Sequence, residues 1–166
     1  MKSDSRLERL LEAGEFVVTG ECGPPKGADA EKLKKKAEPL VGHVDAVNVT
    51  DNQTAIVRMS SIGASALLVQ MGLEPVMQMV CRDRNRIAMQ SDILGAAALG
   101  IKNMLCLTGD HQQFGNHPAS KNVFDLDSLQ LLQMVKKMRD DKLFQNGDEI
   151  RNTKKSPVVE PKMFLG

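Results

Sequence analysis

Short apolar runs of strand length alternate along this chain with longer segments whose apolar residues recur at helical spacing. The runs predict strands at about 16–20, 46–50, 75–80 and 103–107, and the longer segments predict helices at about 4–13, 29–41, 58–71, 86–99 and 127–140. Asp29 is placed to cap the start of one helix, and Gly72 and Gly100 are placed to end two others. Strand followed by helix, four times over, is the pattern of a parallel sheet, and Met163–Leu165 would begin a fifth strand.

The predicted strands VNV, VMQMV and MLCL are apolar or nearly so throughout, which indicates strands covered on both faces. Two α/β architectures fit: an open doubly wound sheet, which 166 residues suit by length, and part of a TIM (β/α)8 barrel, which needs about 250 residues when complete. No GxGxxG turn or P-loop follows the first strand, and the motifs described below favour the barrel. We therefore expect residues 1–166 to be the N-terminal portion of one barrel domain, truncated after strand five.

The composition is that of one globular domain, with 42% hydrophobic residues but only 3% aromatic ones. Ten methionines and the aliphatic residues must therefore fill the interior. The net charge of +1 provides no field that would attract nucleic acid or an anionic membrane. The one basic run, KLKKK at 32–36, is predicted to be the solvated face of a helix whose buried side carries Leu33, Ala37, Leu40 and Val41.

The apolar runs and the cysteines indicate in which cellular compartment the protein is expected. The longest apolar runs have only strand length, so no membrane span is predicted, and the N-terminus lacks the apolar core of a signal peptide. Cys22, Cys81 and Cys106 are odd in number and far apart, as expected of reduced thiols. We therefore expect a cytoplasmic protein.

Each of the four apolar runs ends in a carboxylate: Glu21, Asp51, Asp83 and Asp110. The intervals are about thirty residues, the length of one strand-plus-helix repeat. Because parallel strands all end at one edge of a sheet, these acids are predicted to converge there, on the face that carries the chemistry in barrels of this kind.

Glu21 precedes Cys-Gly-Pro-Pro, and the two prolines stiffen the loop that follows it. A carboxyl group fixed in this way can act, when protonated, as a proton donor. The alternative is a structural salt bridge to an arginine such as Arg82 or Arg84.

Two further motifs follow strands. Thr108-Gly109-Asp110 opens a long polar loop, which we expect to be functional, although a helix cap or turn is the alternative. The segment 81–86, Cys-Arg-Asp-Arg-Asn-Arg, suits a diphosphate or ribose, since guanidinium groups bind phosphate oxygens in pairs. The alternative is a surface network that Asp83 neutralises. A hard cation held by the acids is disfavoured, because the arginines would repel it, and no metal ligands are assigned.

Taken together, TGE near the first strand, VTDN after the second, QMVCRDRNR at the third, LTGD after the fourth and VFDLDSLQLL downstream resemble methylenetetrahydrofolate reductase, in the variant of anaerobic bacteria and archaea. The resemblance runs from about Glu15 to Gly166. It implies a (β/α)8 barrel that uses FAD to reduce 5,10-methylenetetrahydrofolate to 5-methyltetrahydrofolate, with hydride passing through the flavin in a ping-pong reaction.

The resemblance also implies roles for individual residues. Glu21 matches the acid that protonates the folate nitrogen, and Asp110 matches the aspartate that lies near the flavin and the pterin. The positions implied to contact the flavin or lie close to it are Thr50, Gln78, Arg82, Asp83, Arg84, Thr108, Gly109 and Asp110. Gln78 stands where the better-known bacterial branch has histidine.

The implied partners are methylenetetrahydrofolate and an electron donor, NAD(P)H or a reduced carrier, in one-carbon or methionine metabolism. A half-barrel would expose a sheet edge and apolar surface, so we expect self-association or a partner subunit. The alternative function is a non-catalytic half-barrel that serves as a binding module in a reductase complex.

Overall fold

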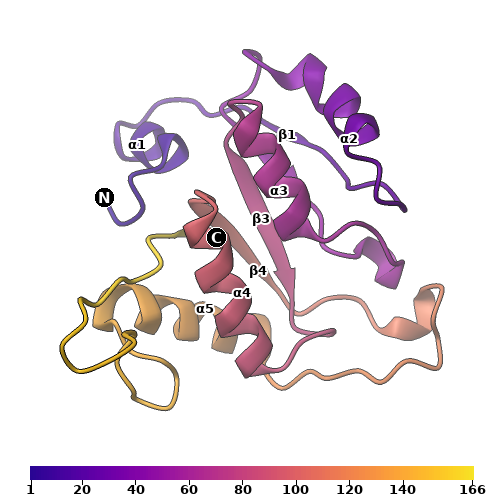
Figure 1. Cartoon of the computed structure of the whole chain (residues 1–166). Coiled ribbons are helices and arrows are strands. Elements are labelled where there is room, and N and C mark those ends of the chain that lie inside the picture. Colours follow the sequence, from indigo (N-terminus) through magenta and orange to yellow (C-terminus); the bar gives the residue numbers. More distant parts are fainter.

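A computed structural model describes all 166 residues, and Figure 1 shows its strands and the helices around them. The strands form one parallel five-stranded α/β sheet. Neighbouring strands are parallel and follow the order of the chain, β1-β2-β3-β4-β5. The strands are β1 (Thr19–Glu21), β2 (Ala46–Val49), β3 (Pro75–Val80), β4 (Asn103–Leu107) and β5 (Phe164–Leu165).

Helices connect the strands, as the alternating pattern predicts. They are α1 (Arg6–Glu12) before the sheet, then α2 (Ala30–Ala37), α3 (Ser61–Gln70), α4 (Arg86–Ala98) and α5 (Ser128–Lys136). Short turns of helix extend the loops: η1 (Glu38–Leu40), η2 (Gln53–Ala55), η3 (Gln112–Phe114) and the π-turn η4 (Lys137–Asp141). None of the helices combines the length and the apolar composition that crossing a bilayer requires.

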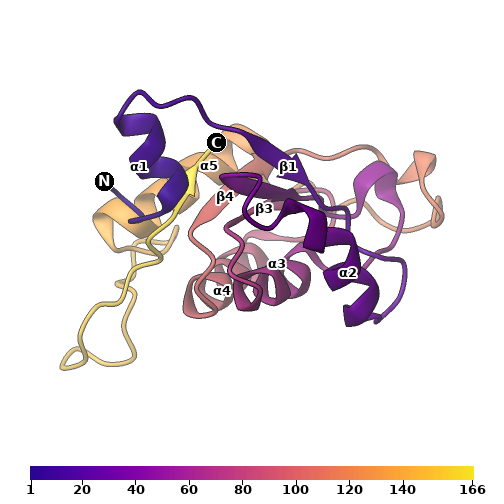
Figure 2. The ribbon, with the colours of Figure 1, turned by 90° about the horizontal axis from the view of Figure 1, so that it is seen from above.

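The strand order distinguishes between the two architectures that the sequence leaves open. Right-handed crossovers between consecutive neighbours place the connecting helices on one face of the sheet, and Figure 2 shows α2, α3 and α4 together on one side. A doubly wound sheet would instead reverse its strand order and carry helices on both faces. The chain therefore has the arrangement of successive (β/α) units of a TIM-like barrel.

The side chains that point toward the helices form the core. Val47 and Val49 of β2 pack with α2 and α3, while alternate residues of β3 and β4 pack with α4 and α5. Seven of the sixteen residues in the larger cluster are methionines, which confirms that methionine fills this interior. The opposite face is less covered than predicted, since Val76, Leu105 and Leu107 are only half-buried there.

Three predicted boundaries are wrong, each for a local reason. The first strand begins at Thr19, because only Thr19–Glu21 pair with β2, and Phe16 is 89% exposed. The third helix begins at Ser61 instead of about residue 58, since the Ser60 hydroxyl caps it by accepting from the Gly63 N–H at 3.1 Å. Val41 is 45% exposed because α2 ends at Ala37, and a 3-10 turn follows.

Candidate functional site

The four loops that follow β1, β2, β3 and β4 lie at one edge of the sheet, which we call the carboxyl edge. The strands are parallel, so Glu21, Asp51, Asp83 and Asp110 all belong to this edge, as their spacing predicts. The register adds a second constraint. Glu21 pairs with Asn48, and Asn48 pairs with Val76, so their side chains share one face of the sheet.

Glu21 keeps a free carboxylate on that face. It is the last residue of β1, its side chain is exposed, and it forms neither a salt bridge nor a side-chain hydrogen bond. Gln78 lies two residues beyond Val76 and so points to the same side. Its backbone carbonyl accepts a 2.7 Å hydrogen bond from the Ser61 hydroxyl, but its amide group forms none.

Asp51 has the opposite character, because its side chain is fully buried. One carboxylate oxygen accepts from the Val80 N–H at 3.0 Å and from Arg84 Nη1 at 2.6 Å. Arg84 also donates to Asp92 at 2.9 Å. Burial acts to lower the pKa of Arg84, but the bonds to Asp51 and Asp92 outweigh it and raise that pKa above its ordinary value. This pairing joins the loop after β2 to the start of α4.

Arg82 connects three loops of the carboxyl edge. Its guanidinium binds both oxygens of Asp83 at 2.7 Å and donates to the backbone carbonyls of Asp110 at 3.0 Å and Asn52 at 3.3 Å. Burial acts to raise the pKa of Asp83, but the bonds from Arg82 outweigh it and hold that pKa below its usual value. Arg82 itself is 3% exposed, so this network lies inside the edge.

These contacts bear on the predicted phosphate cluster. Arg82, Arg84 and the following arginine, Arg86, each pair with carboxylates, the last with Asp125 at 2.7 Å. The structure therefore shows the network of the alternative interpretation. A role for Arg82, Asp83 and Arg84 beside a flavin remains a prediction, and in this arrangement it would be to hold the loops.

Thr108, Gly109 and Asp110 each have a distinct environment. The Thr108 hydroxyl accepts from the Ser128 N–H at 3.1 Å, which ties β4 to the start of α5. Gly109 has φ +94°, and a Cβ there would lie 2.9 Å from the Val80 Cβ, so this position requires glycine. The Asp110 carboxylate is exposed and unpaired, while its backbone is held by Arg82.

The long loop after Asp110 folds back onto the loop after β2. Gly115 packs so closely on Ala55 that a Cβ would overlap the Ala55 carbonyl, and Asn116 accepts from the Val57 N–H at 3.1 Å. The receiving loop is strained, with φ of +43°, +57° and +56° at Asn52, Thr54 and Ala55. A left-handed backbone conformation at a residue other than glycine costs on the order of 1–3 kcal/mol, and such residues cluster at functional sites.

Unpaired polar atoms gather at the same edge. Seven buried side-chain polar atoms lack a hydrogen-bond partner, and four of them belong to loops of the carboxyl edge. These four are Thr50 Oγ1, Arg58 Nε, Gln112 Oε1 and Asn122 Oδ1. Buried polar groups are normally satisfied, so these four atoms have hydrogen-bonding capacity that the folded chain itself leaves unused.

The cysteines do not supply a nucleophile. All three thiols are free and buried. Burial raises the pKa of the Cys81 thiol to about 11 and that of Cys106 to about 12. Both thiols are therefore protonated at neutral pH and unreactive.

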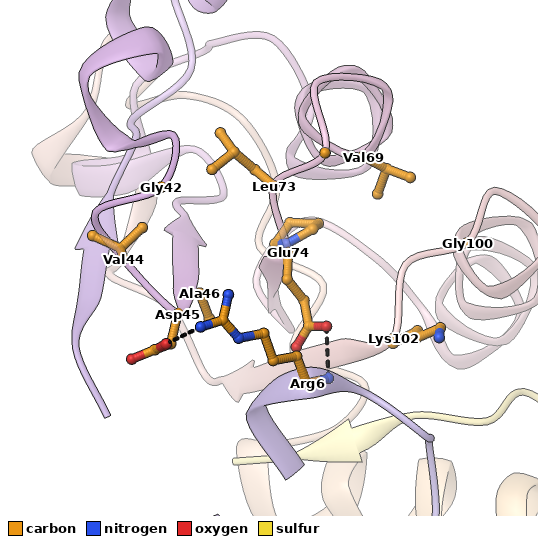
Figure 3. A pocket seen from close by; sticks show the side chains of 12 residues that line it. Arg6, Gly42, Val44, Asp45, Ala46, Val69, Leu73, Glu74, Gly100 and Lys102 are labelled. Atoms are coloured by element: carbon orange, nitrogen blue, oxygen red, sulfur yellow. Dashed lines mark hydrogen bonds and ion pairs between the residues drawn. The ribbon is translucent and has the colours of Figure 1, made fainter. Parts of the chain in front are cut away.

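The opposite, amino edge of the sheet contains a polar cavity of about 260 Å³ (Figure 3). The charged side chains that line it already pair with other groups of the chain. Glu74 accepts from the N–H groups of Arg6 and Leu7 at 2.7 Å, so it caps α1 and fixes it there. The Arg6 guanidinium pairs with Asp45 at 2.7 Å, and Lys102 donates to the Asp4 carbonyl. The cavity thus marks where α1 is attached.

Sequence reasoning missed three participants in the edge. Asn52 joins Arg82 to Asp83, and its only signal is an amide in a position that tolerates left-handed backbone. Arg58 and Lys36 donate to carbonyls of the loop after β1, at Pro24 and Gly23. A sequence pattern carries no signal for them, because each contact joins residues of different elements.

A comparison with known protein families gives one finding. The family model described as methylenetetrahydrofolate reductase matches residues 6–151. No curated protein matches the chain.

Proposed function

The chain belongs to the methylenetetrahydrofolate reductase family, and from that premise we propose that it reduces 5,10-methylenetetrahydrofolate with FAD bound at the carboxyl edge. The proposal rests on one observation above all. Of the four acids at this edge, Asp51 and Asp83 are neutralised by arginines, whereas Glu21 and Asp110 keep free carboxylates.

The residues present fit a flavin. An isoalloxazine ring offers carbonyl acceptors and an imide N–H, and the edge holds an unpaired donor and acceptor in the Gln78 amide. Gly109, with φ +94°, forms the turn that leads directly into Asp110. FAD, when bound, would supply the hydride that the folate receives. The chain's own tasks are then binding, orientation and proton transfer.

Glu21 is the proton donor in this proposal. Its carboxyl group stands on the last residue of a strand, with a Pro-Pro turn after it and no competing ion pair. In its protonated form it can deliver that proton to the folate nitrogen and become a carboxylate, and the protonated nitrogen then leaves the bridging carbon as the five-membered ring opens for reduction.

Asp110 is the orienting acid. Its backbone is fixed by the 3.0 Å bond from Arg82, and Gly109 sets the direction of the chain before it. A carboxylate held in this way can accept from N–H groups of the flavin or the pterin and fix both rings. The electron donor in this proposal is NAD(P)H or a reduced carrier, in a reducing compartment such as the cytoplasm that suits three free thiols.

Anaerobic reconstitution tests the proposal. The purified chain is mixed with FAD and desalted, and its absorbance is then followed while 5-methyltetrahydrofolate is added. We expect flavin to remain with the protein and to show an absorbance band near that of free FAD, at roughly 450 nm. This band should bleach as 5-methyltetrahydrofolate reduces the flavin. Protein that stays colourless after reconstitution would contradict the function and favour the alternative of a binding module.

Glu21→Gln separates the two half-reactions. We expect flavin binding and its reduction by the electron donor to stay near wild type, because Glu21 holds no other group in place. Folate reduction should fall by about a hundred-fold or more, since a glutamine cannot donate the proton. Glu38→Gln, which changes an exposed, unpaired acid away from the edge, is the matched control. Equal loss of both half-reactions would assign Glu21 a structural role.

A further inference from the structure

Arg58 is the exception among the arginines of this chain. Seven of the eight pair with a carboxylate, whereas Arg58 has no salt bridge. It lies in the loop after β2, half-buried at the carboxyl edge. A guanidinium withdrawn from water without a counter-ion is costly, because its desolvation is not offset.

The hydrogen bonds of Arg58 leave most of its donors unused. Nη1 donates to the Pro24 carbonyl at 3.3 Å, while Nε is buried and has no partner. On the neighbouring residue, the Gly23 carbonyl accepts from Lys36 Nζ at 3.1 Å, and Lys36 likewise has no carboxylate partner. The half-buried Arg58 and the exposed Lys36 thus donate to consecutive carbonyls of one turn, Gly23–Pro24.

A third unused donor faces the same turn. Thr50 is 3% exposed, and its hydroxyl has no hydrogen-bond partner. A Cβ placed on Gly23 would lie 3.5 Å from Thr50 Oγ1 and 3.4 Å from Lys36 Nζ. Gly23 therefore lies beside both a hydroxyl and an ammonium.

We infer that the Gly23–Pro24 turn is a binding site for an oxyanion, with Arg58 as its principal ligand and Lys36 and Thr50 as further donors. A planar guanidinium binds two oxygens of a phosphate or carboxylate at once through adjacent N–H groups. The inference rests on the proposed function, in which the oxyanion belongs either to the flavin diphosphate or to the carboxylates of the folate. It also assigns the phosphate contact to Arg58, since the neighbouring arginines at 82, 84 and 86 are paired.

The first test uses inorganic pyrophosphate as the probe and needs no flavin. Isothermal titration of the 166-residue chain should show saturable binding, weakened about ten- to a hundred-fold in Arg58→Gln and less in Lys36→Gln. Arg86→Gln and Lys35→Gln are the matched controls, because they remove the same charge from a paired and from an exposed side chain. Equal weakening in all four variants, or none, would overturn the site.

The second test identifies the source of the oxyanion. If it is a flavin phosphate, Arg58→Gln should weaken FAD and FMN binding while riboflavin binding stays unchanged. If it is a folate carboxylate, FAD binding should persist while the affinity for 5-methyltetrahydrofolate falls. Unchanged affinity for all four ligands would contradict the inference.

The oxyanion site and the reductase proposal can be contradicted independently of each other. Wild-type protein that binds pyrophosphate through Arg58 but takes up no flavin would contradict the reductase proposal and still support the oxyanion site. Wild-type flavin uptake with pyrophosphate, flavin and folate affinities that all stay unchanged in Arg58→Gln would overturn the oxyanion site and leave the reductase proposal standing. Should Arg58→Gln fail to fold, Arg58→Lys can replace it. Lysine keeps the positive charge but cannot form the bidentate hydrogen bonds of a guanidinium, so it should still weaken pyrophosphate binding measurably.

Discussion

The side chain of Asp51 is buried, and three hydrogen bonds replace its hydration. The Val80 N–H and two nitrogens of Arg84 surround its carboxylate, at 3.0, 2.6 and 3.3 Å. Such a pair is costly to break once formed, since one buried charge is then left without a partner.

Replacing Asp51 with Asn should therefore destabilise the fold. The amide can still accept from the Val80 N–H, but it no longer neutralises Arg84, so we expect a loss of about 3 kcal/mol in the free energy of unfolding. Asp92→Asn is the control, because Asp92 is 36% exposed and pairs with the same arginine. It should cost less than about 1 kcal/mol. Urea denaturation measures both, and equal losses would refute the buried-pair account.

The four acids of the edge could be located from the sequence but not told apart. Their spacing after apolar runs predicts the shared edge, and the parallel sheet confirms it. Which of them is neutralised depends on how far an arginine some thirty positions away can reach, as Arg84 does to Asp51. That is a property of packing, and no local pattern encodes it.

Among the elements, the central strands are predicted best and the edge strand worst. β3 and β4 have the predicted bounds, because their apolar residues are enclosed between neighbours. β1 has a single partner strand and only three paired residues, so apolar character at Phe16–Val18 does not make them part of it. The π-turn after α5 has no sequence signal that we can identify.

The contact between η2 and the loop after β4 predicts the effect of Gly115→Ala. The backbone at Gly115 has φ −101°, which alanine adopts freely, so any effect must come from overlap with Ala55. We expect a loss of about 1–3 kcal/mol in stability and faster amide exchange in both loops. Gly27→Ala is the control, since a Cβ there meets no atom within 4 Å. Identical amide exchange rates in Gly115→Ala and Gly27→Ala would contradict a stabilising contact between Gly115 and Ala55.

The link between α4 and the loop before α5 predicts a dependence on pH. Bonds from the Arg86 side chain and N–H lower the pKa of Asp125 from 3.8 to about 2. A depressed pKa means that the stability is fully present above the ordinary value and is lost as pH falls from about 4 to about 2.

Melting temperatures between pH 7 and 2.5 check this dependence. Asp125→Asn should flatten the acid decline relative to wild type, because its titrating group is gone. Asp141→Asn, which changes an exposed aspartate without an ion pair, should keep the wild-type decline. Parallel curves for all three proteins would show that the Arg86 pair does not act in this way.

For the whole molecule, alternation of strands and helices is enough to predict a parallel α/β sheet, and the absence of a nucleotide-binding turn favours the barrel type. The consecutive strand order and the helices on one face agree with that choice (Figures 1 and 2). The half-buried face opposite the helices was not predicted, because apolar strands look alike whether a second layer covers them or not.

The central claim is that ligand chemistry belongs to the carboxyl edge, and mapping of backbone amides by NMR tests it most directly. On titration with FAD, the amide signals of Glu21, Thr50, Gln78, Gly109 and Asp110 should shift together and saturate at one flavin per chain. Signals at the amino edge, such as those of Arg6 and Glu74, should stay in place. Shifts confined to the amino edge, or no saturable shift at all, would contradict the account.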